Sequence, residues 1–394
     1  MEALVIGGDH QNTLGVVEAL GQKGVHVHLI IIATTNKCFV AKSRYVIKKT
    51  SLSKSQEILD YINSEYENCS DIIPVIACSD DAASLLSVNS SQLPKCLAIP
   101  NTSIGGNILE WSDKEKMTQT AIQVGMSVPK SWLVRDIKIP SDITFPCVTK
   151  PYTSVNHGKS GFAKCESSSE LNSYFKALES NEPVQVQQYI DKDFEFQLLG
   201  CSINGGETVI IPGRTHINTT TGFNNLVFLK YDVYEDIYDN VVKLAKKFVA
   251  TTGYSGLFSI EFMHGKDGKD YFLEMNFRND GNGICVTHSG TNLPYIWYLA
   301  CKKENYTIEI NSSTVSTTYM MPEISFFLSM LSGEVSFKEW RNDWKLTNCY
   351  LTYFKEDKSP FYMMLRKNMK GIISCIAVVT LKKLHLYNII KRIK

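Results

Sequence analysis

The residues best suited to chemistry are two carboxylates, an amide and a guanidinium on two neighbouring apolar segments. Glu274, Asn276 and Arg278 are spaced two apart, so on a strand their side chains share one face. Glu261 lies on the preceding segment, and the Gly-containing stretch 264–269 predicts a hairpin between the two. Two carboxylates and an amide oxygen on one surface form a hard-oxygen site that suits Mg²⁺ shared with substrate phosphates. The adjacent guanidinium can bind a phosphate or a carboxylate bidentately.

A solvated outer hairpin face, with Arg278 merely neutralising Glu274, would show the same alternation. Lysines elsewhere favour the catalytic interpretation. Lys150 closes an apolar strand and can point at a phosphate, and Lys114 stands at the start of a predicted helix. The alternative for each is an ordinary surface lysine.

The stretch 156–162 has the composition of a phosphate-binding flap. Gly158, Ser160 and Gly161 lie within it, beside a lysine. Backbone N–H groups of such a loop can cradle phosphates. A plain surface turn has the same composition, so only the other motifs favour a phosphate-binding role for this loop.

Taken in order, these motifs resemble those of the ATP-grasp carboxylate–amine ligases, from about residue 3 to residue 310. The resemblance identifies an entry helix, a strand with the ATP-binding lysine, a flap, a hinge strand whose backbone meets adenine, and a metal triad. The matching stretches are Trp111 to Lys114 with Gly125 to Pro129, Phe145 to Pro151, His157 to Phe162, Val184 to Ile190, and Glu261 with Glu274 to Asn276.

The resemblance implies that ATP is bound, with Mg²⁺, or Mn²⁺ in its place, on Glu261, Glu274 and Asn276. A substrate carboxylate would attack the γ-phosphate, and an amine would displace phosphate from the acyl phosphate. Arg278 and Arg214 would act in catalysis, although Arg214 has a surface arginine as its alternative. The implied ATP-binding residues are Lys114, Lys150, Gly158, Ser160, Gly161, Gln187, Gln188, Tyr189, Ile190 and Glu195, the last as a group that orients Lys150.

Two departures from the family pattern stand out. Gln187 occupies the hinge position that is often Glu, so it can accept a hydrogen bond from an adenosine hydroxyl but supplies no charge. The flap also has fewer glycines than typical members.

Within the family, the chain is most similar to the D-aspartate ligase-like branch, which attaches amino acids during cell-wall (peptidoglycan) synthesis. The similarity is carried by Gly7-Gly8 with Gly15, by Ser43 to Tyr45, and by the stretches 276–283 and 290–294. This branch implies an amino acid such as aspartate as the activated carboxylate. The other functions that remain open are an ATP-grasp kinase, a carboxylase-type user of ATP, and a nucleotide-binding protein without ligase activity.

Around these residues the apolar pattern predicts an α/β (α+β) protein. Residues 1–110 show strand, Gly turn, helix and strand in succession, as in a Rossmann-like pre-ATP-grasp domain. Residues 111–310 are predicted to form a two-subdomain ATP-grasp fold, with subdomains of about 111–183 and 184–310. Residues 311–394 are a C-terminal extension with a basic tail.

Composition excludes several classes of protein. The 394 residues are 44% hydrophobic and carry a net charge of +1, which indicates a globular chain without the basic excess of a nucleic-acid-binding protein. The 11 cysteines form no CxxC pair, which is typical of free thiols in a reducing compartment. The cysteine pattern therefore predicts a cytoplasmic protein, and the charge balance predicts no nucleic acid among its partners. The family resemblance implies small-molecule carboxylate and amine substrates, and both a monomer and a homodimer stay open.

The tail 360–394 is the strongest local charge bias, since it has basic residues interleaved with apolar ones and no Asp or Glu. Such a segment predicts peripheral contact with an anionic membrane. The alternative is a C-terminal helix or strand that packs on the ATP-grasp domain and leaves its cations in solvent.

Overall fold

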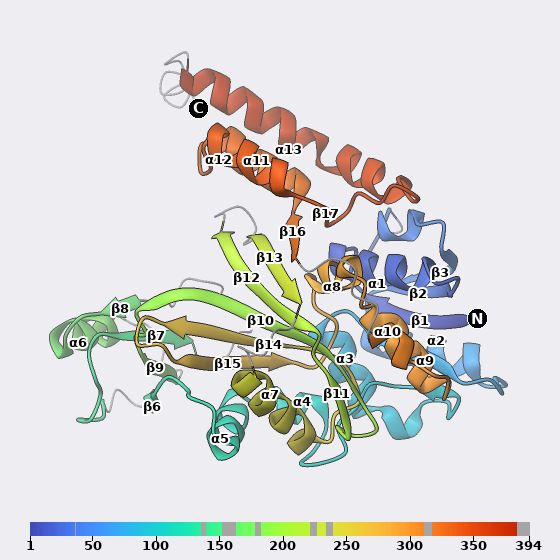
Figure 1. Cartoon of the computed structure of the whole chain (residues 1–394), viewed down its shortest axis with the longest axis horizontal. Coiled ribbons are helices and arrows are strands. Elements are labelled where there is room, and N and C mark those ends of the chain that lie inside the picture. Colours follow the sequence, from blue (N-terminus) through green and yellow to red (C-terminus); the bar gives the residue numbers. More distant parts are fainter. Residues whose placement is uncertain are drawn as a thin grey trace.

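The computed structural model describes residues 1–35, 37–134, 139–151, 163–177, 183–220, 227–233, 239–310 and 317–383. Figure 1 shows a large twisted sheet in the middle of the molecule, a parallel sheet beside the N-terminus, a small sheet at the opposite end, and helices of the C-terminal segment above. The α/β fold expected from the sequence is confirmed.

The N-terminal sheet is parallel, with strand order β3-β2-β1-β4-β5. Its central strand β1 (Glu2–Gly7) is buried from Ala3 onward, because helices cover both faces. The order reverses between β1 and β4, which creates a crevice at their carboxyl ends. The other elements are α1 (Gln11–Gly21), β2 (His26–Ile32), η1 (Val40–Lys42), β3 (Val46–Leu52), α2 (Ser55–Tyr66), β4 (Ile73–Ala77), α3 (Asp80–Val88), η2 (Ser90–Gln92), β5 (Leu97–Ala98) and α4 (Ile108–Trp111).

Helix α5 (Lys114–Val124) leads into the small antiparallel sheet. Asp113 caps it by accepting a hydrogen bond from the Lys116 N–H at 2.8 Å, and Gly125 ends it with φ of +98°, as the sequence predicts. The sheet has the order β6-β9-β7-β8 and packs on one helix through its own small core. These elements are β6 (Ser131–Val134), β7 (Cys147–Pro151), β8 (Ala163–Cys165), α6 (Ser168–Ala177) and β9 (Val184–Gln188).

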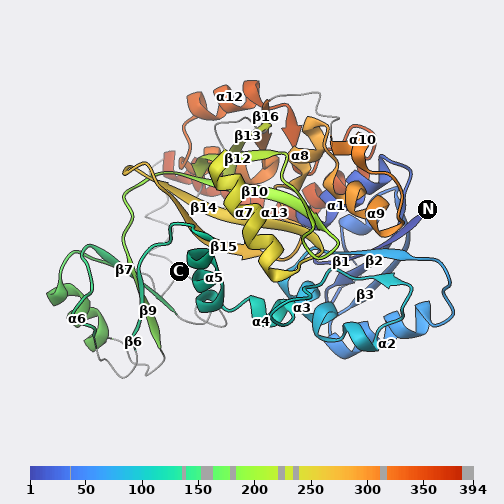
Figure 2. The ribbon, with the colours of Figure 1, turned by 60° about the horizontal axis from the view of Figure 1, so that its bottom comes forward.

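The large sheet runs in the order β15-β14-β10-β12-β13-β16-β17, with β11 beside β10. Helices α5 and α7 pack on one face (Figure 2), and α8 and α9 pack on the other, with α1 of the N-terminal domain against α8 and α9. The predicted hairpin at 264–269 forms, and β10 and β11 make a second hairpin through residues 204–206. The elements are β10 (Lys192–Ile203), β11 (Thr208–Ile210), β12 (Gly213–Thr220), β13 (Val227–Val233), α7 (Asp239–Thr252), β14 (Gly256–Gly265), β15 (Asp270–Asn276), α8 (Gly283–Ser289), α9 (Leu293–Cys301) and α10 (Thr307–Ile310).

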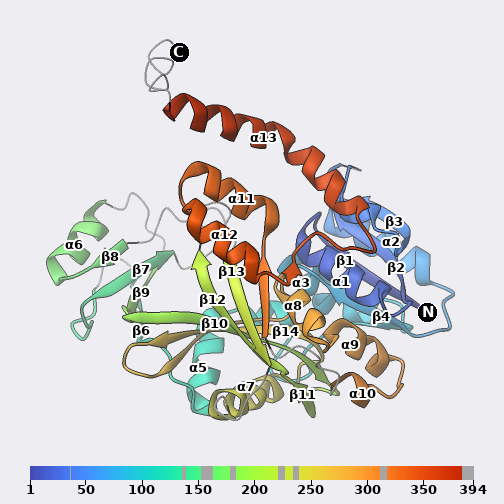
Figure 3. The same cartoon turned by 45° about the horizontal axis from the view of Figure 1, so that its top comes forward.

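The C-terminal segment extends the large sheet instead of forming a separate layer. β16 (Thr317–Met321) pairs with β13, and β17 (Cys349–Tyr350) pairs with β16. Helices α11 (Glu323–Ser332), α12 (Phe337–Leu346) and α13 (Ser359–Lys383) follow or separate these strands. In Figure 3, α13 lies along α11 at one end and projects away from the body at the other.

The tail is therefore a helix over its described part, and it packs on α11 and on η1 of the N-terminal sheet. Within the described residues, no helix is both long enough and apolar enough to cross a membrane. The proposed domain boundaries at 110 and 310 stay a prediction.

Candidate functional site

Glu261 and Glu274 are direct partners across the β14–β15 hairpin. Ser259 pairs with Asn276 two residues along, so Glu274 and Asn276 share the face predicted from their spacing. The amides of Asn276 and Gln197 donate to the same oxygen of Glu261, at 3.3 and 3.4 Å. The structure thus brings the three predicted metal ligands together on one face of the sheet.

The pKa of the Glu261 carboxyl is well above its ordinary value. Burial, together with the nearby charges of Glu274 and Asp280, raises its pKa to about 7. Like charges held together in this way are stabilised by a cation, which removes the repulsion and the desolvation cost at once.

The donor set fits Mg²⁺. Two carboxylates and the amide oxygen that Asn276 can present are hard oxygen ligands, and the remaining positions would be left for phosphate oxygens and water. No group of three or more His, Cys, Asp or Glu side chains suited to a metal occurs in the described part of the chain. Glu261, Glu274 and Asn276 together leave coordination positions open, so these residues suit an ion that shares its coordination with a substrate.

Two lysines approach these carboxylates from the other subdomain. The Nζ atom of Lys114, at the first position of α5, lies 4.0 Å from a Glu274 oxygen. Lys150 on β7 donates to the side-chain oxygen of Gln187 on β9 at 2.7 Å, and Gln187 donates to Ser131 at 3.0 Å. Burial and the charge of Lys114 lower the pKa of Lys150, although Glu274 and Glu195 act in the opposite direction. The two cations repel each other, so an anion placed between them would be stabilised.

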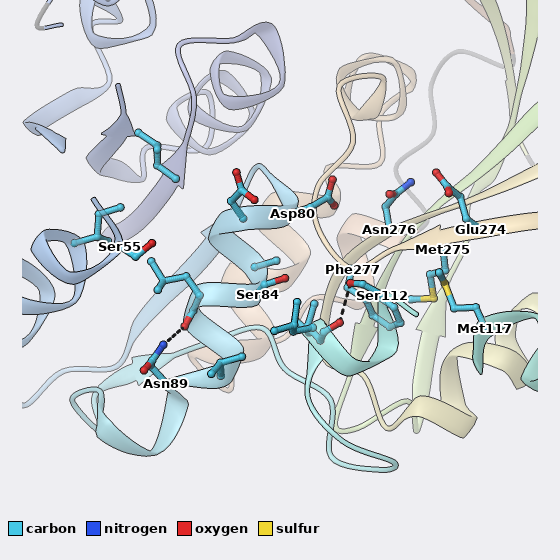
Figure 4. A pocket seen from close by; sticks show the side chains of 18 of the residues that line it. Ser55, Asp80, Ser84, Asn89, Ser112, Met117, Glu274, Met275, Asn276 and Phe277 are labelled. Atoms are coloured by element: carbon cyan, nitrogen blue, oxygen red, sulfur yellow. Dashed lines mark hydrogen bonds between the residues drawn. The ribbon is translucent and has the colours of Figure 1, made fainter. Parts of the chain in front are cut away.

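These charged groups border a cavity of about 810 Å³, lined among others by Asp80, Lys114, Glu274 and Asn276. Figure 4 shows Asp80, Asn276 and Glu274 along one rim of this cavity, with Met275, Met117 and Phe277 beneath them. The cavity lies between α3 and α4 on the N-terminal side and the start of α5 and strand β15 on the other.

Arg278 does not continue the strand face of Glu274 and Asn276, although the sequence spacing predicts that it does. Strand β15 ends at Asn276, and the guanidinium of Arg278 turns to Asp80 and Asp280, with both N–O distances at 3.1 Å. Burial opposes its charged form, but Asp280 and Asp80 outweigh burial and raise the pKa of Arg278. Its side chain is only 17% exposed. Arg278 therefore already has two carboxylate partners, and a substrate carboxylate or phosphate would have to compete with them.

The segment that carries Arg278 connects strand β15 to the N-terminal sheet. The Asn279 N–H donates to the Ala77 carbonyl at 3.2 Å. The Asn12 amide donates to the carbonyls of Cys78 and Asn279, at 3.0 and 2.8 Å. This places the end of β15 directly in the crevice at the carboxyl ends of β1 and β4.

Two of the predicted site residues, Arg214 and Glu195, make other contacts in the structure. Arg214 lies within β12 opposite Leu198, which is one residue out of phase with the Gln197–Glu261 pair, so its side chain is on the other face of the sheet. Its guanidinium lies over Phe194 and Phe196, at 5.6 and 4.9 Å from the ring centroids. The catalytic role of Arg214 stays a prediction, and it would require the side chain to reach the metal pair from the opposite face of the sheet.

Glu195 does not orient Lys150 by a direct contact. Its carboxylate accepts from Lys192 at 2.7 Å, and the partner of Lys150 is Gln187. Gln187, which replaces the glutamate common in the family, thus accepts a hydrogen bond from Lys150, the lysine that the resemblance assigns to ATP binding.

The hinge strand is present but its amides are engaged. The N–H groups of Gln188 and Tyr189 donate to the carbonyls of Lys130 and Pro146, at 2.8 and 3.1 Å. Ile190 follows them as a buried residue. The predicted flap residues Gly158, Ser160 and Gly161 lie outside the described residues.

Three residues were missed as members of the site. Asp280, Gln197 and Asn282 surround Glu261, since Asn282 donates to the Gln197 side chain at 2.8 Å and its own N–H reaches Asp280 at 2.9 Å. Asp280 and Asn282 lie in the loop between β15 and α8, and polar residues in such a loop are a usable signal. Ser79 caps α3, and the neighbouring Asp80 pairs with Arg278.

Comparison with known proteins agrees with this geometry. The ATP-grasp domain family matches residues 119–293. A formate-dependent phosphoribosylglycinamide formyltransferase from Prochlorococcus marinus is 26% identical over 152 residues, which is 37% of this chain and 38% of that protein. The large chain of carbamoyl phosphate synthase from Clostridium botulinum is 26% identical over 185 residues, which is 44% of this chain and 17% of that protein. The chain therefore matches well under half of either relative.

Solved structures share the fold over most of the chain. The L-amino acid ligase from Bacillus licheniformis superposes with a TM-score of 0.58 at 18% identity, and the match covers 80% of this chain and 78% of that one. N5-carboxyaminoimidazole synthetase from Staphylococcus aureus, complexed with ADP, gives 0.63 at 17% identity, with 86% of each chain covered.

Proposed function

We propose that this protein, whose residues 119–293 match the ATP-grasp domain family, is an ATP- and Mg²⁺-dependent carboxylate–amine ligase. The observation that carries the proposal is the approach of two lysines to a carboxylate pair. Lys114 lies 4.0 Å from Glu274, and Glu274 faces Glu261 across the hairpin. Cations beside paired carboxylates provide for a polyphosphate and its metal ion in one place.

In this proposal, each site residue has one role in phosphoryl transfer from ATP. Lys114 and Lys150 neutralise phosphate oxygens, and Gln187 holds Lys150 in position. Glu261, Glu274 and Asn276 would hold Mg²⁺, which when bound neutralises charge on the transferring phosphate. Phosphoryl transfer needs positioning and charge neutralisation more than covalent help, so the chain needs no nucleophilic side chain.

The chemistry balances without further reactants. A carboxylate oxygen attacks the γ-phosphorus of ATP and expels ADP, which gives an acyl phosphate. An amine nitrogen then attacks the acyl carbon, expels inorganic phosphate and loses a proton to form the amide. The cavity between the N-terminal sheet and strand β15 is the space in which the carboxylate would lie, next to Asp80 and Asn276.

The activated carboxylate in this proposal is that of an amino acid, with D-aspartate as the specific case and a cell-wall precursor as the acceptor. It is supported by the similarity of the stretches 276–283 and 290–294 to the D-aspartate ligase-like branch. An L-amino acid ligase is among the proteins that share the fold, whereas no D-aspartate ligase is among those named above.

A panel of amino acids scored for ADP release in the presence of hydroxylamine tests the proposal. An activated carboxylate is trapped as a hydroxamate, which should form with Mg²⁺ or Mn²⁺ and disappear with EDTA. Glu274→Gln should abolish it, whereas Glu67→Gln, on an exposed turn after α2, should not. ATP consumption with phosphorylation of another group would replace the ligase by a kinase, and carboxylation of an amine by bicarbonate would replace it by a carboxylase. Absence of any turnover while ATP binds would leave a nucleotide-binding protein.

A further inference from the structure

Helices α12 and α13 leave an unusual set of large apolar side chains in solvent. On α12, Phe337 is 63% exposed and Trp344 45% exposed. On α13, Tyr362, Met369, Ile373 and Ile376 are exposed as well, with Ile373 at 60%. Folded chains rarely gather such residues on one surface unless something covers them.

The exposed residues of α13 form one stripe. Their spacings of seven, four and three residues return to the same side of an α-helix. The stripe from Tyr362 to Ile376 is about 21 Å long at 1.5 Å per residue. The opposite side of the helix is anchored, because Met363 and Met364 pack against the core that includes α1 and α8.

Helix α12 shows an aromatic stripe beside a basic one. Trp340 contacts Phe337 and Trp344, with ring centroids 6.1 and 5.3 Å apart. Lys338, Arg341 and Lys345 repeat with nearly the same spacing one residue further on, and the acidic residues Glu339 and Asp343 fall on the other side of the helix.

Ring contacts connect the two helices into a single aromatic surface. Trp344 contacts Tyr350, Tyr350 contacts Tyr353, Tyr353 contacts Phe361, and Phe361 contacts Tyr362, with centroid distances between 5.4 and 6.2 Å. The exposed end of α12 is thus continuous with the start of the α13 stripe. Figures 1 and 3 both place α11 beside α13, and α12 packs on α11.

The charge of this surface selects its partner. From residue 359 to residue 394 the sequence has no Asp or Glu, and it carries Arg366, Lys367 and further lysines and arginines. Lys367 pairs with Asp9 at 2.9 Å, which ties α13 to the loop after β1. A second copy that stacked the same helices face to face would place like charges together, which disfavours a dimer through this surface.

We propose that the α12–α13 surface, defined by Phe337, Trp344, Tyr362, Met369 and Ile373, binds the headgroup region of an anionic lipid bilayer. The amphipathic aromatic rings suit the boundary between water and hydrocarbon, and the acid-free helix suits a negatively charged surface. A shallow stripe this long lies in the plane of a bilayer and does not span it. The binding is separate from ATP turnover, because none of these residues lines the cavity beside Glu274.

Co-sedimentation of the full chain with vesicles of phosphatidylcholine, with and without 30% phosphatidylserine, tests the proposal. We expect binding to the anionic vesicles alone, weakened at least tenfold by 0.5 M salt because counterions screen the contact. The double variants Met369→Ser/Ile373→Ser and Phe337→Ser/Trp344→Ser should each lower the partition coefficient at least tenfold. Ile47→Ser removes a side chain that is 57% exposed on β3 and should bind as the unmodified protein does.

Point substitutions are preferable to deletion of the tail, since removal of α13 would expose the core beneath Met363 and Met364. The far-ultraviolet circular dichroism and thermal midpoint of each variant should match those of the unmodified protein, which shows that lost binding is not unfolding. The proposal is overturned if anionic vesicles are not bound, if neutral vesicles bind equally well, or if both double variants bind as before. Conversion of a dimer to a monomer by the substitutions, measured by ultracentrifugation without vesicles, would assign the surface to a second copy instead.

Discussion

Glu261 and Glu274 face each other as direct partners of β14 and β15, and only the first of them is substantially desolvated. The pKa of Glu261 consequently rises to about 7, with burial as the main cause and the Glu274 charge as the second. A pair of this kind is unfavourable without a cation and favourable with one, which is the property that a reversible metal–nucleotide site requires.

Replacement of either carboxylate of this pair should remove the metal-dependent reaction. We expect Glu274→Gln and Glu261→Gln each to lower the rate of Mg²⁺-dependent ADP release by about 100-fold or more, since loss of about 3 kcal/mol of metal-mediated stabilisation gives that factor. Glu261→Gln should also raise the thermal midpoint without Mg²⁺, because it removes a desolvated charge. Both variants should be measured by steady-state ADP release and by thermal unfolding. Unchanged turnover in Glu274→Gln would remove these residues from the site.

Lys150→Ala should weaken ATP binding about tenfold, because a partly buried cation near the phosphates is lost. Gln187→Leu should have a smaller effect of the same sign, since it leaves the charge of Lys150 and removes the 2.7 Å hydrogen bond that positions it, together with the 3.0 Å bond from Gln187 to Ser131. Lys176→Ala, at an exposed position of α6 in the same subdomain, is the matched control. Isothermal titration with ATP and Mg²⁺ measures all three. Equal affinity in Lys150→Ala and in the control would contradict the assignment.

Arg278→Lys keeps the charge but loses the planar fork that reaches Asp80 and Asp280 together. We expect a lower thermal midpoint and at least a tenfold loss of turnover. Asp80→Asn removes one of the two partners and should lower the midpoint less. The comparison separates structure from chemistry: if Arg278→Lys lost stability but kept full turnover, the arginine would only tie β15 to the N-terminal sheet.

The pH dependence of stability should depend strongly on Glu18. This residue is fully buried in α1 beside Ser43, and burial, followed by the effect of Asp357, raises its pKa to about 9. Between its ordinary pKa near 4.5 and about 9, the folded state holds a proton that the unfolded state releases. The contribution of Glu18 to the free energy of unfolding is therefore fully present below pH 4.5, and it is lost by about 1.4 kcal/mol per pH unit as the pH rises through this window.

Glu18→Gln removes this dependence, so the variant should be more stable than the unmodified protein at pH 8 and closer to it at pH 5. Urea unfolding at both pH values measures the difference. A stability gain that is the same at pH 5 and pH 8 would show that Glu18 does not titrate in this way.

The amino-acid sequence by itself determined the local features. The hairpin and the shared face of Glu274 and Asn276 follow from strand alternation, and the start and end of α5 follow from Asp113 and Gly125. These features depend on residues a few positions apart, for which spacing and capping chemistry suffice.

Only the tertiary structure decided which distant groups meet. Gln187 as the partner of Lys150, Asp80 as the partner of Arg278, and the displacement of Arg214 to the opposite face all depend on strand pairing between segments far apart in the chain. A shift of one residue in such a pairing moves a side chain to the other face of a sheet, and the pattern within one strand carries no information about its partner's register. The same holds for α13, whose basic and apolar residues were visible in the sequence but whose anchored and exposed sides were set by packing on α11 and η1.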